Sequence, residues 1–224
     1  MVRKSKKTSK LTRDAILAAA VKLADEAGSD SLSMRKLAAA LGVEAMSLYN
    51  HFAGKDALLM GMADWAIAQI PLPNPKGPWQ DELRARAHNA RAVFKRHPWT
   101  IQLMVSLPNT GPNVLAYVEA TLAVMINAGF DLIDADHAWN LMDSHIYGFT
   151  LQELNFPFAP EEYAEVTQAH LHLIPAETYP NLRAMAEKVA AREYDGLHNF
   201  AQGVELIIAG LEGEGDDHSY SKKR

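Results

Sequence analysis

The stretch SLSMRKLAAALGVEAMSLYNHFAGKDALL, Ser31 to Leu59, contains two short segments with helical spacing of apolar residues and one glycine between them. A helix of about eight residues is not stable alone in water, so the two must pack on each other and on a third element. Ser33 is placed to cap the first segment, in which Leu37 faces inward. Gly42 permits the tight turn that follows. Short helices joined by such a turn are typical of a helix-turn-helix.

The second segment, VEAMSLYNHF over residues 43–52, has the composition of a helix that enters the major groove of DNA. Its expected buried anchors are Val43, Leu48 and Phe52. The other face is too polar for a helix buried on all sides. It carries Glu44, Ala45, Met46, Ser47, Tyr49, Asn50 and His51. In a helix-turn-helix the second helix crosses the DNA backbone and the third reads the groove, so we expect this face to contact double-stranded DNA.

The charge distribution supports a DNA-binding module at the N-terminus. The 224-residue chain has a net charge of −5, but residues 1–60 hold ten Lys or Arg and six Asp or Glu, a balance of +4 that leaves −9 for the remainder. We expect residues 1–10 to form a disordered basic arm that adds salt-sensitive, non-specific affinity. The sequence therefore predicts a basic binding module attached to an acidic body.

Alanine, leucine and methionine dominate the apolar residues, and β-branched residues do not alternate, which predicts an all-α protein. The stretch PLPNPKGP, residues 71–78, separates the first four helices from the rest. Helices are expected at residues 13–27, 34–41, 43–52, 55–70, 79–96, 99–107, 114–128, 131–154, 161–173, 181–193 and 196–211. The expected division is a disordered arm at 1–10, a DNA-binding domain at 11–60, a helical ligand-binding and dimerisation domain at 61–212 and a disordered tail at 213–224.

Several classes of protein are not expected. The chain has no cysteine, so disulfides, thiolate metal sites and cysteine nucleophiles are excluded. The N-terminus lacks the apolar core of a signal peptide, and no apolar run is long enough to span a bilayer. We therefore expect a cytoplasmic protein with no membrane partner and no cofactor. The triad residue types of DSH, residues 143–145, point about 100° apart on a helix and do not indicate an enzyme.

The stretch LSMRKLAAALGVEAMSLYNHFAGKDALL resembles the DNA-binding domain of the TetR family of bacterial repressors, over roughly residues 10–60. The shared elements are the capping serine, RKLA, LGV, the LY-x-HF ending and the lysine after it. The resemblance implies that Arg35 reads a guanine and that Lys55 holds a phosphate at its helix N-terminus. The implied DNA-binding residues are Ser33, Arg35, Ala45, Met46, Ser47, Tyr49, Asn50, His51 and Lys55.

Dimerisation is expected because dimers of this class read two half-sites about 34–36 Å apart. The segment DGLHNFAQGVELIIAGLEGE carries an apolar stripe and two glycines seven residues apart on one face. Glycine costs about 1 kcal/mol inside a helix, so the pair indicates close approach of another helix. We predict half of an intersubunit four-helix bundle, with intramolecular packing as the alternative. The predicted interface residues are Gly148, Phe200, Gly203, Val204, Ile207 and Gly210.

The resemblance extends into the body, where WQDELR and GVELIIAGLE are similar to segments of the Tet repressor C-terminal domain. It implies a homodimeric repressor that a small molecule, bound between the body helices, releases from a palindromic operator. The family's metal-binding histidine corresponds to Met104, whose thioether does not bind Mg²⁺, so magnesium-tetracycline is not expected. An apolar or aromatic ligand is expected instead, and Arg86 would suit a carboxylate. The candidate lining residues, each with core packing as the alternative, are Trp65, Arg86, Asn89, Met104, Tyr117, Thr121, Trp139 and His145.

Three alternatives stay open at this point. Asp134, His137 and His145 would make a metal-sensing regulator if they lay along one helix face. A helical interaction module without specific DNA binding would leave the basic first sixty residues unexplained. A repressor that needs its ligand in order to bind DNA is also compatible with the sequence.

Overall fold

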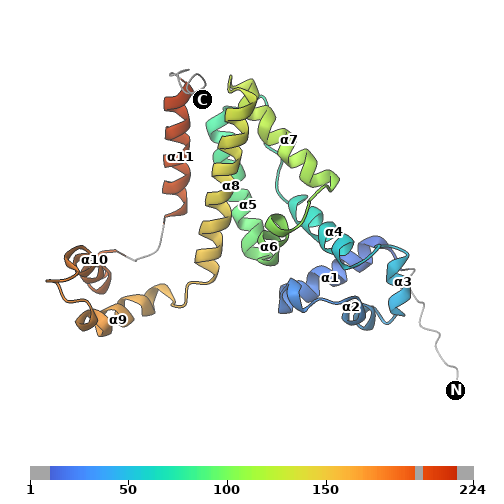
Figure 1. Cartoon of the computed structure of the whole chain (residues 1–224), viewed down its shortest axis with the longest axis horizontal. Coiled ribbons are helices and arrows are strands. Elements are labelled where there is room, and N and C mark those ends of the chain that lie inside the picture. The colour runs from blue at the N-terminus through green and yellow to red at the C-terminus, as the bar shows by residue number, and fades with distance from the viewer. Residues whose placement is uncertain (1–10, 195–198, 216–224) are drawn as a thin grey trace.

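The computed structural model describes residues 11–194 and 199–215, so the expected basic arm and the last nine residues lie outside it. All regular elements in these ranges are helical (Figure 1). They are α1 (Arg13–Ala27), η1 (Ser29–Ser31), α2 (Met34–Leu41), α3 (Ala45–Tyr49), α4 (Lys55–Ile67), α5 (Trp79–Arg96), α6 (Trp99–Ser106), α7 (Pro112–Asn127), α8 (Leu132–Leu154), α9 (Pro160–His170), η2 (Leu171–Leu173), α10 (Pro180–Ala190) and α11 (Phe200–Gly215).

We call the first three helices the head, and α1 and α2 begin where their capping residues predict. Thr12 accepts a hydrogen bond from the backbone N–H of Ala15, and Ser33 accepts one from the N–H of Lys36. Each satisfies a donor that the first turn of a helix otherwise leaves unpaired. Gly42 ends α2 in the left-handed conformation, with φ of 67°, which a glycine adopts without steric cost.

The third helix is shorter than predicted. It spans Ala45–Tyr49, whereas the sequence predicted residues 43–52. Phe52 remains a buried anchor beyond the helix, and Leu48 is completely buried within it. Since tertiary packing of these anchors holds the segment, it does not need the longer helix that apolar spacing alone indicated.

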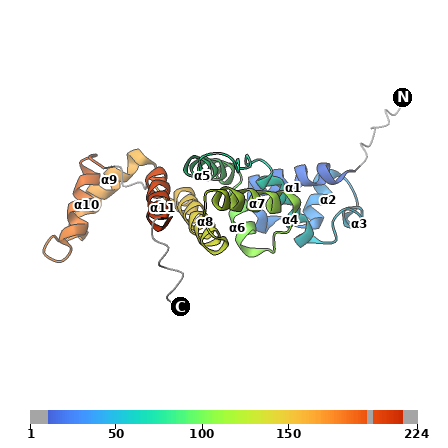
Figure 2. The ribbon, with the colours of Figure 1, turned by 90° about the horizontal axis from the view of Figure 1, so that it is seen from above.

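The body is built around α5, α7 and α8, and α4 joins it to the head (Figure 1). Helix α4 packs on α1 of the head and on α6 and α7 of the body, while α11 lies beside α8 and α5. Helices α9 and α10 form a hairpin that packs mainly on itself. Seen from above, this hairpin and the head lie at opposite ends of the molecule (Figure 2).

The C-terminal helices differ from the predicted bounds. Helix α9 ends at His170 and continues as the short η2, and α10 ends at Ala190, before the expected residue 193. Helix α11 is described over Phe200–Gly215, whereas the sequence predicted a helix over residues 196–211. No helix among residues 11–194 and 199–215 combines the length and the apolar character needed to cross a membrane.

Helices α5 and α8 are joined by an ion cluster on Glu153. Arg91 donates two hydrogen bonds to its Oε2, at 2.9 and 2.6 Å, and Lys95 donates one to its Oε1, at 2.5 Å. Partial burial alone would raise the pKa of Glu153, but these bonds more than offset it and hold the pKa below its ordinary value. The cluster therefore stabilises the fold while Glu153 is ionised.

Glu153→Gln is expected to lower the free energy of unfolding by about 1 kcal/mol at pH 7, since the partly exposed cluster is weakened by solvent screening. A lowered folded-state pKa gives stability that is present above the unfolded pKa and is lost as the pH falls through the folded value. The difference from wild type should therefore shrink as the pH falls from about 5 toward 3. Urea unfolding across this range checks it, with the exposed Glu119→Gln as control. A pH-independent difference would contradict the assignment.

Candidate DNA-binding surface and ligand site

The outer face of α3 is exposed, as the sequence predicted. The side chain of Met46 is 74% exposed and that of Tyr49 is 45% exposed, while Leu48 between them has no exposed surface. Ala45 and Ser47 are half-buried, and Asn50 is exposed just after the helix. The helix thus anchors itself through Leu48 and presents a small, mixed surface of a kind that fits a major groove.

The cationic residues expected at DNA flank this helix. Arg35 is exposed near the start of α2, two residues after the cap Ser33, and Lys55 is the first residue of α4. The backbone N–H groups next to Lys55 belong to the N-terminus of α4, where the helix macrodipole favours a phosphate. The α2 and α4 N-termini therefore present Arg35 and Lys55 at the two ends of the helix-turn-helix sequence.

The end of α3 is held in place from α1. Arg13 donates a hydrogen bond of 2.9 Å from Nη1 to the backbone oxygen of His51, and its guanidinium carbon lies 4.1 Å from the centre of the Phe52 ring. A cation over an aromatic face is favourable. Arg13 therefore fixes the segment that follows the recognition helix, which leaves the half-buried His51 at the edge of the α3 surface.

A polar cluster lies in the centre of the body, where α5, α7 and α8 meet. Arg86 of α5 is only 1% exposed. Its Nη2 donates to Oδ1 of Asp143 at 2.6 Å, and its Nε donates to Oγ1 of Thr121 at 3.0 Å. Its guanidinium carbon lies 4.8 Å from the centre of the Tyr117 ring, and Tyr147 donates to Oδ2 of Asp143 at 3.1 Å. We call these five residues the Arg86 cluster.

Burial sets the protonation state of this cluster. Burial alone would lower the pKa of Arg86, but Tyr117 and Asp143 more than offset that effect, and its pKa stays above the ordinary value. Burial raises the pKa of Tyr117 to about 12 and also raises the pKa of Tyr147. Near neutral pH the cluster therefore contains a cationic Arg86 and two neutral phenols, which act as hydrogen-bond donors.

Of the residues predicted to bind ligand, Arg86, Tyr117 and Thr121 are in direct contact. Trp139 stands one turn before Asp143 on α8, and its indole nitrogen is buried. The inward orientation expected for Arg86 is present, but its charge is already paired with a carboxylate of the chain.

The other predicted ligand residues lie elsewhere. The ring of Trp65 packs edge-to-face on His97, and Asn89 and Met104 are half-buried. His145 stacks on Phe200 with ring centres 5.1 Å apart, and its Nε2 lies 3.1 Å from the Phe200 backbone oxygen. In the described structure His145 thus packs on α11 and is not part of the Arg86 cluster, and its place in a ligand site stays a prediction. His145 is two residues from Asp143, about 200° around the helix, and so faces α11.

Sequence reasoning missed Asp143 and Tyr147. With Trp139 they are spaced four residues apart, which places all three on one face of α8. A signal was present in the sequence. The inner face of a long helix carries two polar side chains at this spacing, and a neighbouring helix carries an arginine, which together indicate a buried ion pair.

Two aspartates, also missed from sequence, connect the head and α4 to the body. Oδ1 of Asp25 in α1 accepts a hydrogen bond of 2.7 Å from the indole of Trp99 and lies 2.8 Å from Nδ1 of His97. Asp64 of α4 caps α7, since its Oδ1 accepts from the N–H groups of Asn113 and Val114 at 2.8 and 3.1 Å. The head is therefore held at the start of α6 through Asp25, and α4 is held at the start of α7 through Asp64.

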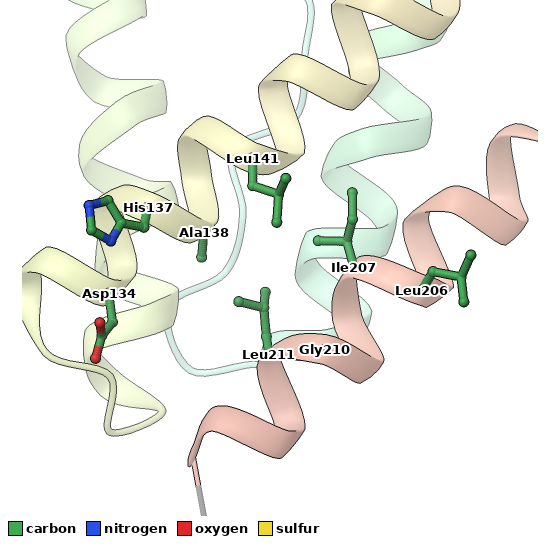
Figure 3. A pocket seen from close by; sticks show the side chains of 8 residues that line it. All are labelled: Asp134, His137, Ala138, Leu141, Leu206, Ile207, Gly210 and Leu211. Carbon is green, nitrogen blue, oxygen red and sulfur yellow. The ribbon is translucent and has the colours of Figure 1, made fainter. Parts of the chain in front are cut away.

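An open groove of about 490 Å³ runs between α8 and α11 (Figure 3). Leu141 of α8 is 52% exposed and Leu206 of α11 is 67% exposed. The residues that line the groove are Asp134, His137, Ala138, Leu141, Leu206, Ile207, Gly210 and Leu211. Two of the predicted dimer residues, Ile207 and Gly210, belong to it.

Three of the predicted dimer residues pack within the chain instead. Phe200 and Val204 are 4% and 0% exposed in the single chain, so they belong to its own core. A Cβ at Gly203 would clash with the ring of His145, which explains this glycine by contact between α8 and α11. Gly148 is exposed, and a Cβ there would meet no atom. The sequence could not distinguish a glycine that faces its own chain from one that faces a partner.

Comparison with known families decides what this arrangement belongs to. Residues 16–61 match the family described as bacterial regulatory proteins, tetR family, and residues 70–214 match the tetracyclin repressor-like, C-terminal domain. The chain belongs to the TetR family. The predicted resemblance is therefore confirmed for the head and for the body.

TetR-family repressors are also the relatives in sequence. The chain is 30% identical to the HTH-type transcriptional repressor DrrR1 of Streptomyces coeruleorubidus over 221 residues, which cover 91% of this chain and 81% of that one. It is 31% identical to the tetracycline repressor protein class D of Escherichia coli over 209 residues, covering 91% and 90% of the two chains. The chain is thus a DNA-binding repressor of the TetR family and not an enzyme.

The structure is also similar to solved structures of TetR-family proteins. The TetR family protein ActR of Streptomyces coelicolor, solved in complex with actinorhodin, superposes with a TM-score of 0.78 at 26% identity and covers 93% of this chain and 100% of its own. The all-α fold predicted from sequence, with a helix-turn-helix head and a helical body, is therefore confirmed.

Membership of the TetR family removes the interaction-module alternative. The metal-sensing alternative is not supported either, because residues 11–194 and 199–215 contain no group of three or more His, Cys, Asp or Glu side chains that could hold a metal ion. Asp134 and His137 line the α8–α11 groove, whereas His145 bonds to the backbone of Phe200.

Proposed function

We propose that this repressor binds a palindromic operator as a homodimer and leaves it when a small molecule binds in its body. The exposed face of α3 carries the proposal. Met46 and Tyr49 are exposed on a helix that is anchored by the buried Leu48, so they are free to contact DNA. Such a regulator works where the chromosome lies, in the cytoplasm of a bacterium.

The chemistry of each side chain suggests its role on the operator. Arg35 is the side chain that would pair with guanine O6 and N7, because its planar fork matches these two acceptors. Ala45, Met46 and Ser47 would face bases, with apolar contact to a thymine methyl. Ser33, Tyr49, Asn50, His51 and Lys55 would hold the backbone, since phosphate contacts fix register without reading sequence.

The second copy would cover the α8–α11 groove. Each helix exposes a leucine there, Leu141 on α8 and Leu206 on α11, and α8 of one subunit laid against α11 of the other would complete a four-helix bundle. Gly148 and Gly210 are exposed, and a side chain at either position would meet no atom of the same chain. They therefore leave room for a helix of the second subunit to approach closely. In this proposal residues 11–60 form the DNA-binding domain, and residues 61–212 form the dimerisation and ligand-binding domain.

The ligand would bind beside the Arg86 cluster, since α7 connects this cluster to α4 through the Asp64 cap. A ligand that displaces α7 would move α4 and the head that it carries, and a change of a few Å in half-site spacing prevents both heads from docking. ActR, a relative in fold and sequence, was solved with actinorhodin bound, which supports a small organic ligand here.

The decisive experiment is selection of genomic fragments by the purified full chain, followed by footprinting. A palindrome of two half-sites protected at low salt is the expected result. Protection of a single half-site would refute the dimer, and the absence of any protected site at low salt, where phosphate contacts are strongest, would refute specific reading by α3.

Arg35→Ala is expected to weaken operator binding by about 1–3 kcal/mol and to relax specificity at one base pair of each half-site. Operator variants at every position, titrated against both proteins, measure this. Lys22→Ala, which removes an exposed cation of α1, is the control and should leave the base preference unchanged. If Arg35→Ala bound all variants as wild type does, the role of Arg35 would be wrong.

A further inference from the structure

We propose that the ligand of this repressor is an uncharged aromatic compound rich in hydrogen-bond acceptors, and that Arg86, Tyr117 and Trp139 bind it as donors. The inference rests on the proposed ligand site in the body and assigns its chemistry. It replaces the carboxylate that the sequence alone suggested for Arg86.

The first step is the balance of donors and acceptors. Six buried side-chain atoms have no hydrogen-bond partner in the described structure, and three of them are Nη1 of Arg86, Oη of Tyr117 and Nε1 of Trp139. A guanidinium and an indole N–H can only donate, and a neutral phenol readily donates. Buried donors in proteins are almost always satisfied, so three of them in one region indicate that acceptors come from a bound molecule.

The acceptors of the cluster are already used. Oδ1 of Asp143 accepts from Arg86 and Oδ2 accepts from Tyr147. Oγ1 of Thr121 accepts from Arg86 and donates its own proton to the backbone oxygen of Tyr117 at 2.8 Å. Each oxygen of Asp143 thus already accepts a hydrogen bond, whereas the unpartnered atoms of Arg86, Tyr117 and Trp139 can all donate, which favours ketone, quinone or ether oxygens in the ligand.

The second step is charge. Arg86 and Asp143 form an ion pair at 2.6 Å in which the side chains are 0% and 15% exposed. The pair is neutral as a whole. A carboxylate ligand would have to give up its hydration beside the buried carboxylate of Asp143, whereas an uncharged ligand keeps the pair intact. The phenol of Tyr117, whose pKa burial raises to about 12, adds no negative charge near neutral pH.

The third step is the shape of the surroundings. The Tyr117 ring lies under the Arg86 guanidinium, and the Phe94 and Tyr147 rings are in contact with centres 5.5 Å apart. Trp139 shares the inner face of α8 with Asp143 and Tyr147. Flat apolar rings beside a few polar donors are what a planar aromatic ligand needs, because the rings supply contact area and the donors fix orientation.

The test compares 2-acetylnaphthalene with 2-naphthoate, which share a ring system and differ in that one carries a neutral ketone and the other a carboxylate. Calorimetric titration of the full chain at neutral pH should show the ketone binding at least about tenfold more tightly. Asp143→Asn keeps an oxygen for Arg86 and removes the negative charge, so it should shift the preference toward 2-naphthoate.

Tyr117→Phe keeps the test independent of any effect of Asp143→Asn on folding. It removes a hydroxyl that makes no hydrogen bond within 3.5 Å in the described structure, so the melting temperature should change little, while affinity for the ketone should fall about two- to tenfold. The matched control is Tyr179→Phe, at an exposed tyrosine before α10, which should change neither quantity.

The outcomes separate the two proposals. Three results would overturn this ligand class. They are tighter binding of 2-naphthoate by wild type, an unchanged ketone affinity in Tyr117→Phe, and binding of neither compound, which is expected if water alone fills the site. If operator selection succeeded in such a case, the repressor proposal would still hold. Ketone binding as expected by a chain that selects no operator would instead refute the proposed function and leave the ligand class standing.

Discussion

Leu141→Asp is expected to separate the dimer and to lower operator affinity about 10²- to 10⁴-fold, the range by which linking two binding modules raises affinity. Leu141 is 52% exposed on α8 and lies in the groove opposite Ile207 and Leu211 of α11 (Figure 3). In the proposed bundle a carboxylate at this position would be buried against apolar side chains of the partner without a compensating charge. Each head would then bind its half-site alone.

Sedimentation and operator titration of the same samples measure this effect. Leu115→Asp is the matched control, because Leu115 is 55% exposed on α7 and outside the groove, and it should leave both the mass and the affinity unchanged. A Leu141→Asp protein that remained dimeric and bound the full operator as tightly as wild type would show that the groove is not the subunit interface.

Asp143→Ala is expected to lower the free energy of unfolding by about 3–5 kcal/mol, because it leaves the buried Arg86 cation without its partner. In a chain of this size a loss of that magnitude lowers the melting temperature by roughly 6–20 °C. Tyr147 would lose its acceptor as well. Differential scanning calorimetry measures the shift.

Two further variants identify the cause. Asp136→Ala removes an exposed carboxylate from the same helix and should have little effect. Adding Arg86→Met to Asp143→Ala removes both charges, and most of the lost stability should return, since an apolar replacement of a buried pair is often neutral. If the double variant were less stable than Asp143→Ala, the unpaired charge would not be the source of the loss.

The local signals in the sequence predicted the helices well. The caps at Thr12, Ser33 and Asp131 act within a few residues, so their pattern is visible in the sequence, and all three accept hydrogen bonds at helix N-termini. The apolar anchors Leu48 and Phe52 were predicted because a helix of the head has a single buried side.

Side-chain pairing between distant helices was harder to predict. The Arg86–Asp143 pair joins residues 57 positions apart, and Asp25 reaches Trp99 across 74 positions. Spacing along one helix gives the face on which a residue lies but not the neighbour that it meets. For the same reason the close approach of His145 to Gly203 was not predicted.

The Asp64 cap has a mechanical consequence, because it gives α4 a pivot. Asp64 lies three residues from the end of α4 at Ile67 and nine residues from its start at Lys55. At 1.5 Å per residue the two arms are about 4.5 and 14 Å long, a lever ratio of about three. A displacement of about 0.7 Å at the short arm would therefore swing Lys55 by about 2 Å, and two subunits turning in opposite senses would double that. In the proposed mechanism, a small shift of the body beside Asp64 would therefore become a larger shift of Lys55, the first residue of α4.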